Sequence, residues 1–245
     1  RLACKDSLEI SILMEHLKKE GNKEFIFLTL TAPNVKGDKL EEEIRKYNKS
    51  FDKLMKRNEV KNIVKGYIRK LEVTYNSDMS SKSYDTYHPH FHVVIAVNKT
   101  YFKKSDLYIN QQRWLELWQE ATGDSSITQV DVRKSRANNL KEVYELAKYS
   151  AKDSDYLISR PVFETFYKAL KGKRFIVYGG LFSEANIMYE NGELDCYKVR
   201  DEIEYVYMMC YQWKQREYEN TKIRELTPEE KKQFNKNLVD VIEID

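Results

Sequence analysis

Histidines alternate with apolar residues in the segment YHPHFHVVIAV, residues 87–97, and this pattern constrains the fold more than any other feature of the chain. Three of the four histidines fall here, at positions 88, 90 and 92. Side chains two positions apart lie on the same face of a β-strand, so His90 and His92 would stand side by side. The side chains at the intervening odd-numbered positions would enter a core on the other face: Phe91, Val93 and Ile95. The pattern therefore predicts a strand that presents paired imidazoles to a divalent metal ion.

A metal ion that acts on a phosphate needs a further ligand and open positions for the substrate. Glu72, in RKLEVTY on the expected preceding strand, is the candidate, because a hard carboxylate suits Mg²⁺ or Mn²⁺. A lone histidine is more often a surface or core residue, but two alternating histidines beside a glutamate favour a metal site. His88 precedes Pro89 and is open to three interpretations: a metal ligand, a substrate contact or neither.

A second group of chemically active residues lies in EVYELAKYSAKDSDYL, residues 142–157. On a helix, Glu145, Tyr149 and Lys152 would share one face. A tyrosine oxygen can attack a phosphodiester if a metal polarises the phosphate and a cation stabilises the phenolate. Lys152 can supply that charge, and Glu145 can act as general base. Alone this spacing is weak evidence, because the chain holds 18 tyrosines; beside the histidine strand it favours catalysis.

Periodicity predicts the remaining elements. Asp6 and Glu9 resemble a capping box that opens a helix ending near Gly21. Further helices are expected from Asp38, over 111–122, 140–152, 162–170 and 184–190, and strands over 25–31, 64–75, 90–97, 127–132, 175–178 and 204–213. We expect a core over residues 1–158 and a C-terminal extension over 159–245.

Composition excludes several classes. Hydrophobic residues make up 41% and charged residues 33%, which is typical of a folded protein. No apolar run reaches membrane-spanning length and no export signal is evident, and three distant cysteines fit neither a disulfide framework nor a Cys-rich zinc site. The net charge is only +3, but basic residues concentrate in 36–70 and 160–174. Such patches suit a phosphate backbone or are simply solvated helix faces.

Three motifs in order, FLTLTAPN, HPHFHVVIAV and ELAKYSAKDSDYL, resemble those of rolling-circle replication initiators from small staphylococcal and bacillar plasmids, which are HUH endonucleases. The resemblance implies an α+β fold: a five-stranded antiparallel sheet flanked by helices, here with a C-terminal α/β extension. It implies that His90 and His92 bind Mg²⁺ or Mn²⁺, with Glu72 placed like the acidic third ligand. It also implies that Tyr149 is the nucleophile, that Glu145 activates the water that ends the cycle, and that Lys152 belongs to a Tyr-x-x-Lys pattern.

The function implied by the resemblance is site- and strand-specific nicking of the double-strand origin. A 5′-phosphotyrosyl intermediate and a free 3′-hydroxyl primer would form, followed by strand transfer or hydrolysis and rejoining. The expected partners are plasmid origin DNA in single-stranded or hairpin form, a host helicase and a host DNA polymerase, in the bacterial cytoplasm. No nucleotide-binding P-loop is present, so strand separation would depend on the helicase. The C-terminal extension would recognise the origin, mediate dimerisation or complete the fold, and homodimer formation stays open.

Two rival functions remain. An HUH transposase or relaxase would share the nicking chemistry, although relaxases carry the tyrosine before the histidines. A DNA-binding copy-number regulator would keep the metal site only as a structural feature. A zinc-stabilised binding module is disfavoured because the cysteines are not clustered.

Overall fold

The computed structural model describes residues 2–135, 146, 155, 157–197, 207–214, 217–225 and 227. Five strands form one antiparallel sheet in the order β4-β1-β3-β2-β5. Their bounds are Lys23–Leu30 for β1, Val64–Asn76 for β2, Thr86–Asn98 for β3, Val130–Ser135 for β4 and Ile176–Gly180 for β5. The histidine segment thus lies in the central strand. The α+β class and the five-stranded antiparallel sheet are confirmed.

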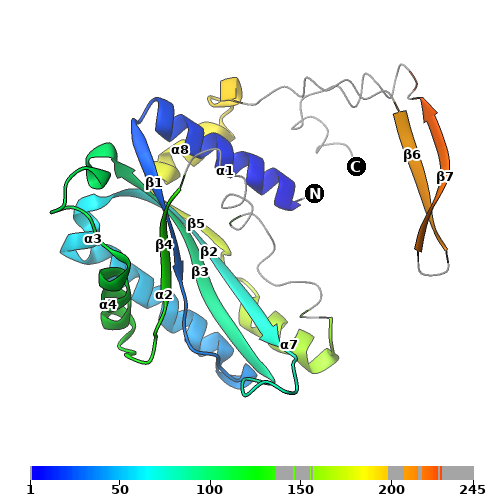
Figure 1. The fold of residues 1–245 in the computed structure, drawn as a ribbon, viewed down its shortest axis with the longest axis horizontal. Helices are drawn as coiled ribbons and strands as arrows, with labels where there is room; N and C mark the ends of the chain where they lie inside the picture. The colour runs from blue at the N-terminus through cyan, green and yellow to red at the C-terminus, as the bar shows by residue number, and fades with distance from the viewer. Residues whose placement is uncertain are drawn as a thin grey trace.

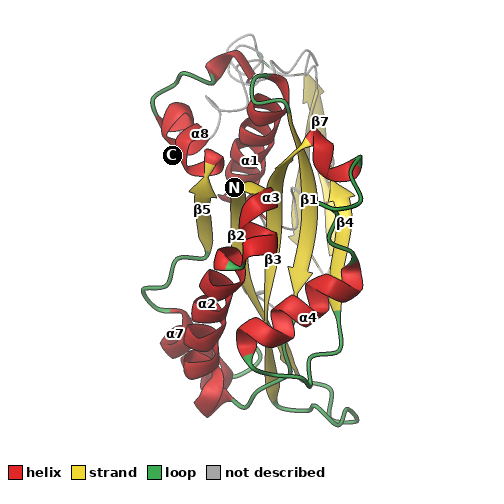
Figure 2. Cartoon of the chain, turned by 90° about the vertical axis from the view of Figure 1, so that its left-hand side faces the viewer, coloured by secondary structure: helices red, strands yellow, loops and turns green. Residues whose placement is uncertain are grey.

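Helices cover both faces of this sheet (Figure 1). One face carries α2 (Leu40–Lys56), α3 (Asn58–Ile63), α4 (Gln111–Thr122) and α7 (Arg160–Leu170), and the other carries α1 (Leu2–Lys19) and α8 (Leu181–Glu190). Figure 2 shows α2 and α7 packed together at one end of the sheet. Short 3-10 turns occur at Gly37–Lys39, Lys99–Phe102 and Asp195–Tyr197. None of the helices in the described part of the chain is long and apolar enough to cross a membrane.

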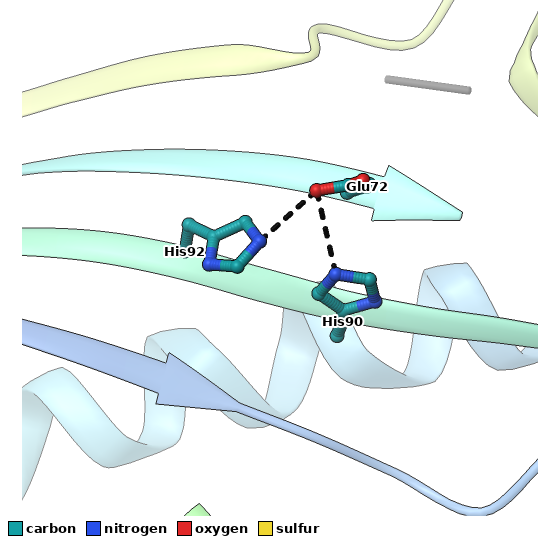
Figure 3. A group of neighbouring side chains, drawn as sticks. All are labelled: Glu72, His90 and His92. Carbon is teal, nitrogen blue, oxygen red and sulfur yellow. Dashed lines mark hydrogen bonds and ion pairs between the residues drawn. The ribbon is translucent and has the colours of Figure 1, made fainter. Parts of the chain in front are cut away.

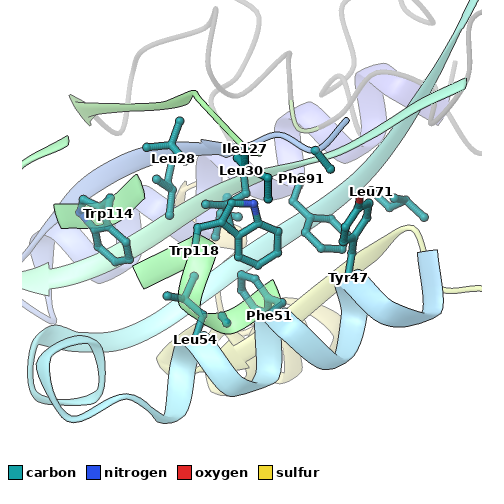
Figure 4. Close-up of a cluster of buried hydrophobic side chains, with 14 of the residues drawn as sticks. Leu28, Leu30, Tyr47, Phe51, Leu54, Leu71, Phe91, Trp114, Trp118 and Ile127 are labelled. Atoms are coloured by element: carbon teal, nitrogen blue, oxygen red, sulfur yellow. The ribbon is translucent and has the colours of Figure 1, made fainter. Parts of the chain in front are cut away.

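The larger core lies between the sheet and the helices α2, α3, α4 and α7. The aromatic side chains of Phe51, Phe91, Trp114 and Trp118 fill its centre, each at most 1% exposed (Figure 4). Burying one such side chain stabilises the fold by roughly 1.5–3 kcal/mol. Trp118 also donates its indole N–H to the backbone carbonyl of Thr31 at 2.8 Å, which fixes α4 to the chain just beyond β1. This core supports the sheet from the face opposite the histidines.

The second core lies between the sheet and the helices α1 and α8. It contains Phe27 of β1, Ile68 of β2, Val94 of β3 and Leu146. Because side chains alternate along a strand, the residues two or four positions from these also belong to this face. They include Thr29, Glu72 and His92, so the candidate site extends this second core toward the end of the sheet.

Several boundaries differ from the expected ones. The first helix begins at Leu2, so the predicted capping box at Asp6 is wrong: the helix already continues through that residue. The strand expected over 127–132 lies at Val130–Ser135. Ile127, an apolar residue that extended the predicted strand, is instead buried in the loop before it. The strand expected over 204–213 is β6 (Tyr207–Lys214), and it pairs with an unpredicted strand, β7 (Glu217–Glu225), in a separate two-stranded sheet. The helix expected over 140–152 lies outside the described residues except for Leu146.

The division after residue 158 stays a prediction. Part of the expected extension is built into the same layers as the rest of the chain, because β5 pairs with β2 and α7 packs against α2. Gly66 permits this pairing. A Cβ there would lie 2.8 Å from the backbone nitrogen of Leu181 and 2.9 Å from the carbonyl oxygen of Gly179.

Candidate metal centre

Two adjacent strands bring Glu72, His90 and His92 together (Figure 3). Glu72 of β2 lies directly opposite His90 of β3 in the strand register, and His92 follows two positions along on the same face. One ligand atom from each of the three side chains lies within 4.8 Å of the others. The structure therefore brings together the two histidines and the glutamate that the sequence predicted as a group.

The distances within this group suit a divalent ion. The Oε2 atom of Glu72 lies 3.0 Å from Nε2 of His92 and 3.4 Å from Nε2 of His90. Adjacent ligands of an octahedral ion with bonds near 2.1 Å are about 3 Å apart. Glu72 is 2% exposed and His92 is 8% exposed, so both residues are largely shielded from solvent.

Hydrogen bonds at the far side of each ring orient the imidazoles. His90 Nδ1 lies 3.2 Å from the backbone carbonyl of His88, and His92 Nδ1 lies 3.3 Å from the hydroxyl of Thr29. A carbonyl only accepts, so Nδ1 of His90 carries a proton, and in the neutral imidazole its Nε2 then has a lone pair on the side of Glu72. A carboxylate oxygen and two imidazole nitrogens are donor atoms that divalent ions accept. The donor set thus fits a bound cation.

His88 lies beside the three-residue group. Its ring stacks on that of His90 with 5.2 Å between centroids, and its backbone carbonyl orients His90. Burial, and then the proximity of His90, lower the pKa of His88 below its ordinary value. Its direct role as a metal ligand or substrate contact stays a prediction.

Lys70 and Thr29 belong to this site and were not identified from the sequence. Lys70 is 2% exposed, lies opposite His92 in the register and shares the face of Glu72, two residues further on. A buried ammonium group is costly unless anions compensate it. The signal was present in RKLEVTY, where Lys70 and Glu72 stand at alternating positions. Thr29 lies within the strand expected over 25–31, but its contact with His92 depends on a register that the sequence does not give.

The predicted nucleophile Tyr149 and its partners Glu145 and Lys152 lie outside the described residues. Two described residues bracket them. Leu146 is fully buried in the second core, and a carboxylate oxygen of Asp155 accepts the backbone N–H of Tyr75 at 3.1 Å. Tyr75 follows Glu72 by three residues on β2, so the chain after Tyr149 contacts the strand that carries Glu72, and the chain before it contacts the second core.

Fold and site together define an α+β protein whose central antiparallel sheet carries a buried Glu-His-His group able to bind a metal ion. Comparison with known proteins then gives the family: the chain belongs to the family described as "Replication protein", whose model matches residues 1–221.

Similar proteins come from several bacteria. The chain is 59% identical over 160 residues to a "Protein rep" of Staphylococcus aureus, covering 65% of this chain and 68% of that protein. It is 36% identical over 203 residues to a "Protein rep" of Lentilactobacillus hilgardii (78% and 62%), and 33% identical over 231 residues to one of Bacillus amyloliquefaciens (82% and 66%). The chain thus spans between 62% and 68% of the length of these relatives. No solved structure matches it.

Proposed function

We propose that this protein initiates rolling-circle replication of a plasmid by nicking one strand of origin DNA, with Tyr149 as the nucleophile. The observation that carries the proposal is the buried group of Glu72, His90 and His92, in a member of a replication protein family. A bound Mg²⁺ or Mn²⁺ would polarise the scissile phosphate and neutralise its charge. Glu72, His90 and His92 would hold that ion, and Thr29 and the His88 carbonyl would keep the imidazoles aligned.

The chain's own residues would carry out the transfer. The phenolic oxygen of Tyr149 forms a bond to phosphorus as the bond from phosphorus to the 3′-oxygen breaks. Glu145 accepts the phenolic proton, Lys152 stabilises the developing phenolate, and the departing 3′-oxygen takes a proton to become the hydroxyl that primes synthesis. The energy of the broken phosphodiester is kept in the 5′-phosphotyrosyl bond, so rejoining needs no nucleotide.

Termination would reverse or hydrolyse this bond. Either the new 3′-hydroxyl attacks the phosphotyrosyl group, or Glu145 activates a water molecule that releases the DNA. Strand separation and synthesis would be left to a host helicase and a host DNA polymerase. The anchors at Leu146 and Asp155 support the assignment, because they tie both sides of the tyrosine segment to the sheet that bears the metal group.

Cleavage of labelled single-stranded oligonucleotides carrying candidate plasmid origins tests the proposal. Intact protein with Mn²⁺ is expected to give a covalent adduct on a denaturing gel, and EDTA or Tyr149→Phe is expected to abolish it. Tyr144→Phe and Tyr156→Phe are matched controls from the same segment and should retain the adduct. If Tyr149→Phe keeps the adduct and one of the control variants loses it, the nucleophile is that other tyrosine. Tight origin binding without any cleavage would favour the copy-number regulator.

A further inference from the structure

Two aromatic side chains stand exposed on the outer side of α7. Phe163 is 45% exposed and Tyr167 is 55% exposed, and their rings lie nearly parallel, at 14°, with 6.2 Å between centroids. The opposite side of the helix is buried in the larger core through Val162, Phe166 and Ala169. The inner side of α7 thus packs into the core, and the two outer rings are not needed to fill it.

One cation contacts these rings, and further basic residues lie on α7 or directly after it. The ammonium nitrogen of Lys171 lies 5.3 Å from the centroid of the Tyr167 ring. Arg160 pairs with Glu164 at 2.8 Å and Lys173 with Glu41 at 3.7 Å. Over the described ranges, no carboxylate forms an ion pair with Lys168, Lys171 or Arg174. The outer side of α7 therefore combines two flat rings with an excess of positive charge.

Figure 1 shows α7 at the end of the sheet where β2 ends, and Glu72 and His90 each lie four residues from this end of their strands. Phe166 packs on Tyr87 with 5.2 Å between ring centroids, and Tyr87 precedes His90 by three residues on β3, about 10 Å along the strand. The rings face away from the metal group, because α7 covers the opposite side of the sheet. A strand held at the metal group would reach them by passing around this end of the sheet.

We propose that Phe163 and Tyr167 form a platform on which unpaired bases of the origin strand stack, while Lys168, Lys171 and Arg174 contact its phosphates. The inference rests on the proposed function and extends it by naming a second DNA contact outside the metal site. Positive charge with exposed rings suits single-stranded nucleic acid: stacking on aromatic side chains tolerates any base, and a basic surface follows the backbone.

The test measures binding of fluorescein-labelled oligo-dT by anisotropy in EDTA, where no cleavage interferes. Replacing either ring by leucine keeps the apolar bulk but removes the stacking surface, so Tyr167→Leu and Phe163→Leu should each weaken binding about 5- to 150-fold. Tyr167→Trp keeps an aromatic ring at this position and should bind with wild-type affinity. Tyr108→Leu is the matched control, since Tyr108 is also exposed, at 53%, but lies before α4 rather than on α7; its affinity should not change.

A second measurement separates this inference from the proposed function. At saturating origin oligonucleotide, the α7 variants should form the covalent adduct at the wild-type rate. They should differ only in needing a higher DNA concentration to reach half of that rate. Wild-type affinity in both leucine variants would overturn the platform even if the adduct forms. If no protein forms an adduct but the leucine variants still lose affinity, the nicking proposal fails and the platform stands.

Discussion

Replacing Glu72 with glutamine removes a buried negative charge and should have opposite consequences with and without metal. The carboxylate is 2% exposed and faces two ring nitrogens at 3.0 and 3.4 Å. If both imidazoles are neutral in EDTA with their Nδ1 atoms protonated, the carboxylate gains little from the facing Nε2 atoms and its burial costs desolvation. We therefore expect Glu72→Gln to melt at or above the wild-type temperature in EDTA.

With Mn²⁺ the order should reverse. An ion present at 100 times its dissociation constant stabilises the folded state by about 2.7 kcal/mol. For a chain of this size each kcal/mol raises the melting temperature by roughly 2–4 °C, so the wild-type protein should gain about 5–11 °C. Glu72→Gln should lose most of that gain, because the amide oxygen is neutral and binds the ion more weakly.

Differential scanning fluorimetry over a Mn²⁺ titration measures both effects, with Glu59→Gln as a control for a surface carboxylate. A loss of about 3–5 kcal/mol for Glu72→Gln in EDTA would refute the reasoning, because it would identify Glu72 as the partner of a protonated histidine in a structural ion pair. An unchanged Mn²⁺ shift in the variant would show that the ion binds elsewhere.

Three further predictions concern residues that support the site. Lys70→Met removes a buried cation from the metal-binding face, and it should slow adduct formation on denaturing gels by about tenfold or more while the Mn²⁺ shift in melting temperature persists. Leu146→Ala should cost about 2–5 kcal/mol in urea denaturation, because the side chain is fully buried in the second core; a loss below about 1 kcal/mol would contradict that packing. Gly66→Ala should lower the melting temperature, since the new methyl group would meet backbone atoms of β5 and α8 at 2.8–2.9 Å, and an unchanged melting curve would refute the close approach.

The histidine strand was predictable from sequence because its signal is local. Alternation of polar and apolar side chains sets which face each residue occupies, so the pairing of His90 with His92 follows without any knowledge of the rest of the chain. Glu72 was a weaker inference, since its position opposite His90 depends on the register of the β2 and β3 hairpin. The register could not be read from the polar turn between the strands.

Other elements gave no such signal. The strand β7 reads EYENTKIRE, a run of mostly polar residues without alternation of polar and apolar types, so a period of two could not identify it. The contribution of β5 to the sheet was also unpredictable, because pairing with β2 joins residues more than a hundred positions apart. The position of Lys70 could have been inferred, but a lysine on a strand is usually exposed, and only its burial shows that it belongs to the site.

The two faces of the sheet divide the roles in this protein. The face toward α2, α4 and α7 is packed with aromatic side chains, and on it β3 contributes only apolar residues between its histidines. The other face is apolar near α1 and α8 and becomes polar toward the end of β2, where Lys70, Glu72 and His92 are buried. A rigid support behind a polar site would hold the candidate ligands within the tolerance that the proposed phosphoryl transfer requires. The same argument explains why α7 can carry exposed rings: its inner side already stabilises that support, so its outer side is available to bind DNA.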